Sequence, residues 1–330
     1  MSLKFGKHHR PWFAVAGTVA VTVAALAGCG SSSPAAGGSG GDSLTPITVA
    51  VSLSSSSLGA YVAAQEGFFK QNGLNATLIK IQNKTNLIDG LGNSFDFGIT
   101  YGPTVIAAVA KGLDVQAVAG ANEVGGTATP DTALMLPPGS NISSVAQLAG
   151  KRIGAGTTNG VTNLMTLVWL KQAGVQPTDV TAVAVSLGTM GDQLQAGRIA
   201  TAEVVEPYIA QLKNEGFKSL GFVENHVLSS PTVVSVWAAS KTWADQHKNV
   251  VAEFQKSQAE AISWIYSHRA QSNKILSQQI GVPLASIQSA PNPDYRATLT
   301  TSDFSTFISM MQNVGWLKTS VSASSMFYGG

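Results

Sequence analysis

The stretch ITVAVSLSSSSLGAYVAAQEGFFKQNGLNATLIKI, residues 47–81, contains a complete strand–helix–strand unit and decides the fold class. Its first segment, Ile47–Leu53, is rich in β-branched and apolar residues, which is typical of a buried strand. Gly59–Gly73 has apolar residues at helical spacing and ends on glycine, so it predicts an amphipathic helix. Asn75–Ile81 has strand composition again. Two strands joined by a helix predict a parallel pair with a crossover connection.

The same alternation continues along the chain. Further strands are predicted at Phe95–Thr100, Leu113–Ala121, Asp131–Pro137, Lys151–Gly156, Asp179–Leu187, Ile199–Val205, Phe217–Val223 and Val233–Ser240. Helical spacing fills most of the segments between them, and long helical stretches follow at Thr242–Gln279 and Thr301–Trp316. Strict alternation of strand and helix predicts two α/β units, each built on a parallel sheet with crossover helices.

The order of the segments predicts two lobes. The roughly 290 residues that follow the N-terminal region are more than one small domain needs. We expect lobe I to comprise residues 45–130 and 232–330, and lobe II to comprise residues 131–231. The chain would cross between them near Thr127–Leu136 and Ser229–Ala239, which predicts a protein with a cleft between its lobes.

The N-terminal 28 residues have the composition of a secretion signal. Lys4, Lys7 and Arg10 precede an apolar run that extends only from Trp12 to Gly28. This run is shorter than the ~20 residues of a membrane span, and Ser, Pro and Gly follow it instead of a stop-transfer cluster. We therefore expect residues 1–28 to be removed as a signal peptide.

The tetrapeptide LAGC, which ends at Cys29, resembles the lipobox of bacterial lipoproteins. This resemblance implies cleavage before Cys29 and lipidation of that residue. Residues 29–44 would then be a lipidated cysteine and a flexible tether, because the segment is dominated by Ser and Gly. We expect an extracytoplasmic protein that a lipid anchors to the bacterial cell membrane.

Charge and cysteine content exclude several classes of protein. Removal of the signal peptide leaves 17 basic residues against 18 acidic ones, a net charge of −1. No basic run is interleaved with aromatic residues, so we expect no nucleic-acid partner. Cys29 is the only cysteine, and His226, His247 and His268 are widely spaced. We therefore expect neither a disulfide nor a metal site, and no cofactor.

Six blocks of sequence occur in a characteristic order and spacing: YVAAQEGFFKQNGLNATLI, FDFGIT, AAVAKGLDVQAVAG, SVAQLAGKRIGAGTTNGVTN, WLKQAGVQPTDV and DQLQAGRIATAEVVEPYIA. Together they resemble the substrate-binding proteins of ABC importers in the nitrate, sulfonate, taurine and thiamine-precursor group, over residues 46–325. The resemblance implies the type II periplasmic-binding fold, in which two α/β lobes joined by a two-strand hinge close on a ligand. It also implies ABC permease transmembrane subunits with a cytoplasmic ATPase as partners. We expect a monomer.

Ligands of open α/β sheets bind beyond the carboxyl ends of the strands, which points to particular loops. The first loop follows Ile47–Leu53 and supplies the candidates Ser55, Ser56 and Ser57; the alternative is a solvated serine loop. The second loop supplies Thr100 and Tyr101. Tyr101 would stack on a ligand ring or fill the cleft wall.

Three later loops complete the candidate site. Thr157, Thr158 and Asn159 lie in GAGTTNG, which lacks both the lysine of a P-loop and the spacing of a dinucleotide fingerprint. They would add neutral donors at a helix N-terminus, or Thr158 or Asn159 would only cap the helix. Thr189 follows the next strand. In the resembling family a Glu-Pro pair closes a strand near the cleft, and this points to Glu206 and Tyr208; Glu206 would accept a hydrogen bond from a ligand amine, or pair within the hinge.

The candidate loops carry no Lys or Arg, which disfavours a multiply charged anion. A monoanion of the sulfonate, nitrate or taurine type stays open, and a neutral or zwitterionic heterocycle of the thiamine-precursor type is favoured. The prediction is a solute-binding lipoprotein of an ABC importer that catalyses no reaction. The alternatives are a ligand sensor for a membrane partner, or an enzyme like the pyrimidine synthase of the same fold group, whose histidine and cysteine-rich segment this chain lacks.

Overall fold

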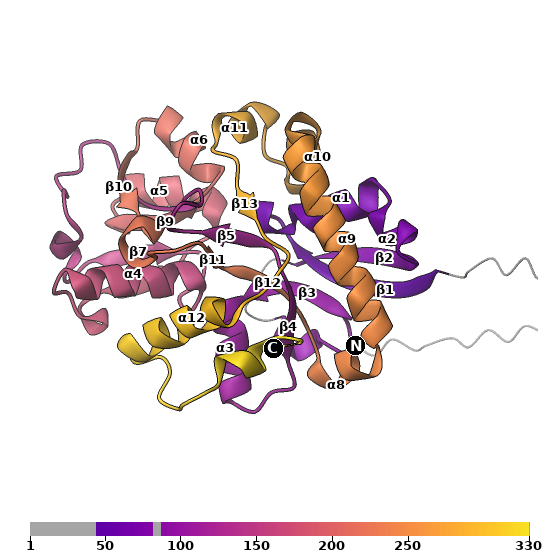
Figure 1. Ribbon diagram of the computed structural model, residues 1–330. Helices are drawn as coiled ribbons and strands as arrows, with labels where there is room; N and C mark the ends of the chain where they lie inside the picture. The colour runs from indigo at the N-terminus through magenta and orange to yellow at the C-terminus, as the bar shows by residue number, and fades with distance from the viewer. Residues whose placement is uncertain (1–43, 82–86, 330) are drawn as a thin grey trace, which may run out of the picture. The chain divides into compact units, whose positions relative to one another are not determined.

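The computed structural model describes residues 44–81 and 87–329, which belong to one compact unit. Cys29, the predicted signal peptide and nearly all of the predicted tether lie outside this part. Two five-stranded sheets flanked by helices form the described structure, and a small three-stranded sheet joins them (Figure 1).

The first sheet has the strand order β2-β1-β3-β12-β4. Its strands are β1 (Thr45–Ser52), β2 (Leu74–Ile81), β3 (Phe97–Tyr101), β4 (Gln116–Gly120) and β12 (Ser235–Ala239). β1 is parallel to β2 and β3, as predicted, but β12 is antiparallel to both of its neighbours. The prediction of a wholly parallel sheet is therefore wrong, because β12 comes from the returning chain, which enters the sheet from the opposite side.

The second sheet has the order β10-β6-β9-β7-β8. Its strands are β6 (Thr132–Leu136), β7 (Arg152–Ala155), β8 (Thr181–Ala184), β9 (Thr201–Val205) and β10 (Lys218–Phe222). β7 is parallel to β8 and β9, whereas β6 is antiparallel to β9 and β10. Here too the strand that enters from the crossing reverses direction, so this sheet is mixed as well.

Most of the helices occupy predicted segments, with some breaks, but α11 was not predicted. They are α1 (Leu58–Gln65), α2 (Phe68–Gln71), α3 (Gly102–Ala110), α4 (Val161–Gln172), α5 (Met190–Gln195), α6 (Tyr208–Asn214), α7 (Glu224–Val227), α8 (Lys241–Gln246), α9 (Lys248–Ser267), α10 (Arg269–Ile280), α11 (Leu284–Ser289) and α12 (Thr301–Asn313). Short 3-10 turns are η1 (Ser55–Ser57), η2 (Ile88–Gly90), η3 (Val145–Leu148), η4 (Pro177–Asp179), η5 (Leu187–Thr189) and η6 (Ala323–Met326). Two helices that the sequence predicts as continuous are interrupted.

The breaks have local causes. The predicted helix Gly59–Gly73 divides into α1 and α2 at Gly67, whose φ of 83° is a left-handed conformation that glycine adopts without strain. The long stretch after β12 divides at His247 and His268. Each histidine donates from Nδ1 to the carbonyl oxygen of the tryptophan four residues earlier, at 2.8 and 3.1 Å. These bonds satisfy carbonyl groups at the helix C-termini.

The two large sheets are connected by the small sheet β11-β5-β13. β5 (Asn122–Val124) leaves the first sheet, and β11 (Thr232–Val233) returns to it. They pair antiparallel, and β13 (Asp294–Tyr295) adds to the other edge of β5. β5 and β11 are the two connecting strands between the α/β lobes.

An arginine from the C-terminal segment fixes these connecting strands. Arg296 donates from Nε to Glu123 Oε2 at 2.6 Å and from Nη2 to Asp303 Oδ1 at 2.7 Å. Asp303 Oδ1 also accepts the backbone N–H of Val233, at 2.9 Å. Burial would raise the pKa of Asp303, but the hydrogen bonds from Arg296, Val233 and Thr300 outweigh it and lower that pKa. One guanidinium thus ties β5, β11 and α12 together.

Arg296→Met should destabilise the fold by about 3–5 kcal/mol, because it leaves the buried carboxylate of Asp303 without its cation. Chemical denaturation at neutral pH measures this change. The control is Lys241→Met, which breaks the exposed Lys241–Asp245 pair and should have no measurable effect. Equal effects of the two substitutions would contradict the role assigned to Arg296.

Candidate ligand-binding site

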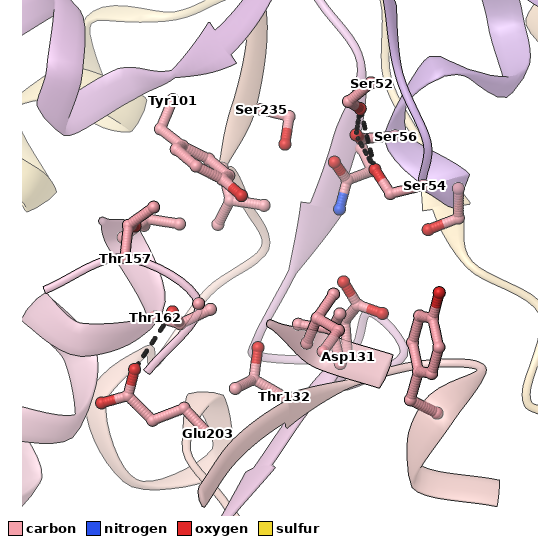
Figure 2. A pocket seen from close by; sticks show the side chains of 18 of the residues that line it. Ser52, Ser54, Ser56, Tyr101, Asp131, Thr132, Thr157, Thr162, Glu203 and Ser235 are labelled. Carbon is pink, nitrogen blue, oxygen red and sulfur yellow. Dashed lines mark hydrogen bonds between the residues drawn. The ribbon is translucent and has the colours of Figure 1, made fainter. Parts of the chain in front are cut away.

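A cavity of about 450 Å³ lies where elements of both large sheets and the connecting strands meet (Figure 2). This volume suits a small-molecule ligand. Its polar lining residues are Ser52, Ser54, Ser55, Ser56, Tyr101, Asn122, Asp131, Thr132, Thr157, Thr162, Ser186, Glu203, Tyr208, Glu224 and Ser235.

A second hollow, of about 460 Å³, is formed by residues 88–93, 113–114 and 240–246. Residues of η2, of α8 and of loops beside the first sheet line it, and the second sheet contributes nothing to it. Its Asp114 carboxylate already accepts bonds from the Ser240 hydroxyl and from the backbone N–H of Thr242, at 2.6 and 3.1 Å. The first cavity is therefore the better candidate for a site that responds to the arrangement of both sheets.

The serine loop after β1 forms one wall of the first cavity. Hydroxyl groups of Ser52, Ser54 and Ser56 are linked, with Oγ–Oγ distances of 2.9 Å from Ser52 to Ser54 and 2.8 Å from Ser54 to Ser56. Ser55 and Ser56, two of the predicted ligand-binding residues, line the cavity. Ser57 does not, because it is fully buried and accepts the backbone N–H of Ser52 at 2.9 Å. Ser52 was not predicted from the sequence.

The end of β3 contributes Tyr101 but not Thr100. Successive residues of a strand face opposite sides, so Tyr101 reaches the cavity while Thr100 is fully buried elsewhere. Burial, and secondly the negative charge of Asp131, raises the pKa of Tyr101 to about 12. The phenol therefore stays protonated at neutral pH and offers a hydrogen-bond donor.

The loop before α4 contributes only its first predicted residue. Thr157 lines the cavity, whereas Thr158 and Asn159 form an exposed turn outside the lining. The helix N-cap is Gly160, which has no side chain to cap it, so neither neighbour serves as the predicted cap. Instead Thr162, in the first turn of α4, faces the cavity (Figure 2). A ligand role for Thr158 and Asn159 stays a prediction.

Of the residues predicted in the two remaining loops, only Tyr208 lines the cavity. Thr189 is exposed and donates to the carbonyl of Ser186 at 3.1 Å, while Ser186 itself lines the cavity. Glu206 lies outside the cavity lining; it is 6% exposed and accepts the backbone N–H of Ala210 at 3.2 Å. Tyr208 is half-buried and does line the cavity.

Glu203 is a buried carboxyl group that the sequence prediction missed. It lies in the middle of β9, and the pairing of Thr132 with Val205 and of Leu134 with Glu203 places Thr132 and Glu203 on one face of the sheet. Its oxygens accept bonds from Asn163 Nδ2 at 2.9 Å and from Thr162 Oγ1 at 3.3 Å. Burial raises the pKa of Glu203 to about 7. The sequence did contain a signal that could have identified Glu203, namely a glutamate within an apolar strand. A charged group buried in such a strand needs a hydrogen-bond partner or a functional role.

Asp131 and Glu224 lie where the chain crosses between the sheets. Asp131 directly precedes β6, and Glu224 begins α7 just ahead of the returning strand. The backbone N–H of Asp131 donates to Glu224 Oε1 at 3.4 Å. Burial, and secondly the charge of Asp131, raises the pKa of Glu224 to about 7. Neither residue was predicted, because nothing local shows that the two crossings meet.

The cavity is rich in acceptors. Among the described residues that line it, three are Asp or Glu and none is Lys, Arg or His. Within residues 44–81 and 87–329, no group of three or more His, Cys, Asp or Glu side chains could hold a metal ion. The site thus suits a ligand that brings its own hydrogen-bond donors.

The fold and the position of the site define the class: this is a type II periplasmic-binding fold, two α/β lobes with the cavity between them and two connecting strands. The family model described as "NMT1/THI5 like" matches residues 54–272, so the chain belongs to that family. Among curated proteins, a sequence comparison finds no significant match.

Solved structures agree on the fold. The alkanesulfonate-binding protein SsuA from Xanthomonas axonopodis pv. citri, bound to MOPS, matches with a TM-score of 0.72 and 19% identity over 86% of this chain and 98% of that one. The aliphatic sulphonate binding protein SsuA from Escherichia coli matches with a TM-score of 0.68 and 17% identity, over 86% of this chain and 97% of that one. The nitrate-binding protein NrtA from Synechocystis PCC 6803 matches with a TM-score of 0.69 and 14% identity, over 86% of this chain and 84% of that one. In the described part of the chain, no helix has the length and apolar character needed to cross a membrane.

Glu203→Gln should remove a pH dependence of stability. Because the pKa of Glu203 is raised from 4.5 to about 7, the folded protein keeps a proton that the unfolded chain releases, and stability falls as the pH rises through this range. The free energy of unfolding of the Gln variant should equal that of the wild type near pH 4 and exceed it by about 1–3 kcal/mol near pH 8. Denaturant unfolding across this range measures the difference, with the exposed Glu215→Gln as the control. A constant difference between Glu203→Gln and wild type at every pH would contradict the assignment.

Proposed function

We propose that this chain is an extracytoplasmic solute-binding lipoprotein of an ABC importer. It captures a small polar molecule and delivers it to permease subunits that a cytoplasmic ATPase drives. The observation that carries the proposal is the cavity to which both sheets and both crossings contribute side chains. Membership of the NMT1/THI5-like family and the likeness to importer binding proteins support it.

Ligand capture would work by lobe closure. We propose that lobe I comprises residues 45–130 and 232–330 and that lobe II comprises residues 131–231. The serines after β1 belong to lobe I, and Thr157, Thr162 and Glu203 belong to lobe II. A ligand that contacts both groups binds the closed form more tightly, so it shifts the population toward closure. The permease would recognise the closed, liganded form.

The lining favours a neutral or zwitterionic nitrogen heterocycle over a sulfonate or nitrate ion. An anion would meet three carboxyl groups and no basic side chain among the lining residues, so it would lack charge-assisted partners. A heterocycle with amino groups can donate to the carboxyl and hydroxyl oxygens, and Tyr101 and Tyr208 offer aromatic faces. This preference agrees with a ligand of the thiamine-precursor type.

The side chains of the site favour binding without catalysis. The resemblance to the pyrimidine synthase of the same fold group implies that the synthase carries a histidine and a cysteine-rich segment. Among the described lining residues none is His or Cys, and the sole cysteine of the chain is Cys29. The lining instead offers hydrogen-bonding groups that a solute must match, which is a basis for specificity.

A thermal-shift panel tests the ligand class. Aminopyrimidines should raise the melting temperature, and saturation at ~100 times Kd should add ~2.7 kcal/mol of stability. Alkanesulfonates, taurine and nitrate should produce no shift. Thr157→Ala should weaken the binding of the aminopyrimidine, whereas Thr158→Ala, one residue further along on the exposed turn, should leave it unchanged. Stabilisation by sulfonates alone would contradict the proposed ligand class.

Lipid attachment is tested separately in cells. A fatty-acid probe should label the wild-type protein, and Cys29→Ala should abolish the label and prevent removal of the signal peptide at this site. Gel mobility and membrane fractionation report both effects. An unlabelled, freely secreted wild-type product would refute the lipoprotein proposal while leaving solute binding intact.

A further inference from the structure

Two buried acceptor atoms in the cavity wall have no hydrogen-bond partner within the described residues. They are Glu224 Oε2 and Asn122 Oδ1. Glu224 is 0% exposed and Asn122 is 2% exposed. Both residues line the cavity. A buried acceptor without a donor is unfavourable, so a pair of them facing one cavity indicates that a bound molecule supplies the donors.

The two residues come from the two crossings between the sheets. Asn122 begins β5 on the outward crossing, and Glu224 begins α7 on the return crossing, ahead of β11. Asp131 completes the group, because its carboxyl lines the same cavity and its charge raises the pKa of Glu224. Figure 2 shows Asp131 beside Thr132, on the side of the cavity opposite Ser52, Ser54 and Ser56.

Glu203 differs from this group although it is equally buried. Both of its carboxyl oxygens already accept hydrogen bonds, from Asn163 and Thr162, at 2.9 and 3.3 Å. Glu224 Oε1 accepts the backbone N–H of Asp131 at 3.4 Å, and hydrogen bonds from the Thr132 side chain and from the backbone N–H of Glu224 also act on this carboxyl group. Its Oε2 has no partner within the described residues. The unmet demand for donors is therefore greatest at Glu224.

We propose that Glu224, Asp131 and Asn122 form a subsite for a cationic nitrogen group that carries at least two N–H donors, such as an ammonium, an amidinium or a protonated amino-heterocycle. The proposal rests on the proposed function and specifies the polarity of its ligand. The cationic group would donate to Glu224 Oε2 and Asn122 Oδ1, and the carboxylates would balance its charge. The other polar end of the solute would face the serine hydroxyls on the opposite side.

The subsite implies that binding releases a proton. Burial and Asp131 raise the pKa of Glu224 to about 7, so in the free protein part of the Glu224 population carries a proton near neutral pH. A cation replaces that proton, so its affinity should rise as the pH rises from about 5 to about 8. The other titratable groups in the lining are Tyr101, Asp131, Glu203 and Tyr208, and His226 of α7 stacks instead on Trp169, with the ring centroids 3.9 Å apart.

Benzamidine, benzamide and benzoate provide a test, because they share one shape and carry charges of opposite sign or none. Isothermal titration calorimetry of the full chain should show that benzamidine binds more tightly than benzamide, and that benzoate does not bind. Benzamidine should bind more tightly at higher pH and release protons, as titrations in buffers of different ionisation enthalpy reveal. Benzamide should show neither effect.

Substitutions assign the effect to this subsite. Glu224→Gln keeps the shape of the side chain and should weaken the binding of benzamidine by about tenfold or more, to the affinity of benzamide. It should also abolish proton release. Asp131→Asn, a second variant in a different segment, should also weaken benzamidine. Glu215→Gln, an exposed carboxylate outside the cavity lining, should change nothing.

Several results would overturn the subsite. These are tighter binding of benzoate than of benzamidine, equal benzamidine affinity in Glu224→Gln and the wild type, or a loss confined to Glu203→Gln. If any of these occurs while an aminopyrimidine still raises the melting temperature, the subsite is wrong and the proposed function stands. If neither these probes nor any solute of the panel binds, both fail.

Discussion

The fork of hydrogen bonds around Arg296 is the constraint on which the site depends. Its guanidinium lies between Glu123 on β5 and Asp303 on α12, and Asp303 in turn holds the backbone of Val233 on β11. An arginine can satisfy two carboxylates at once because its donors form a rigid plane. Asn122 directly precedes Glu123, so the ion pairs that hold the connecting strands also set the place of an acceptor in the cavity. The residues that stabilise the connecting strands therefore lie next to a residue that lines the cavity.

One fold can present different side chains to its cavity. The fold neighbours include proteins described as sulfonate- and nitrate-binding, whereas this lining brings Asp131, Glu203 and Glu224 together without a basic residue among the described lining positions. Burial disfavours the charged form of such carboxyl groups and raises the pKa of Glu203 and of Glu224 to about 7. Function here follows from the side chains at the strand ends and not from the fold itself.

Much of the architecture could be predicted from the sequence, because alternation of strand and helix is a local property. Strand direction could not: β12 and β6 look like any other buried strand, and only long-range pairing makes them antiparallel. Ser55, Ser56, Tyr101, Thr157 and Tyr208, which were selected because they follow strand ends, line the cavity. This selection requires only the positions of the strand ends. It could not separate Thr157 from Thr158, because one residue of offset in a turn reverses which side chain faces outward. Glu224 and Asn122 meet through the crossings, which no local pattern reveals.

The position of β12 has a consequence for the nascent chain. This strand lies between β3 and β4 in the first sheet, yet it is synthesised only after the whole of the second sheet. A polypeptide that ends before residue 235 therefore leaves both neighbouring strands with an open edge, and Trp237 is missing from the core between them. Such an edge invites pairing with other chains. The first sheet therefore cannot close before residues 235–239 reach it.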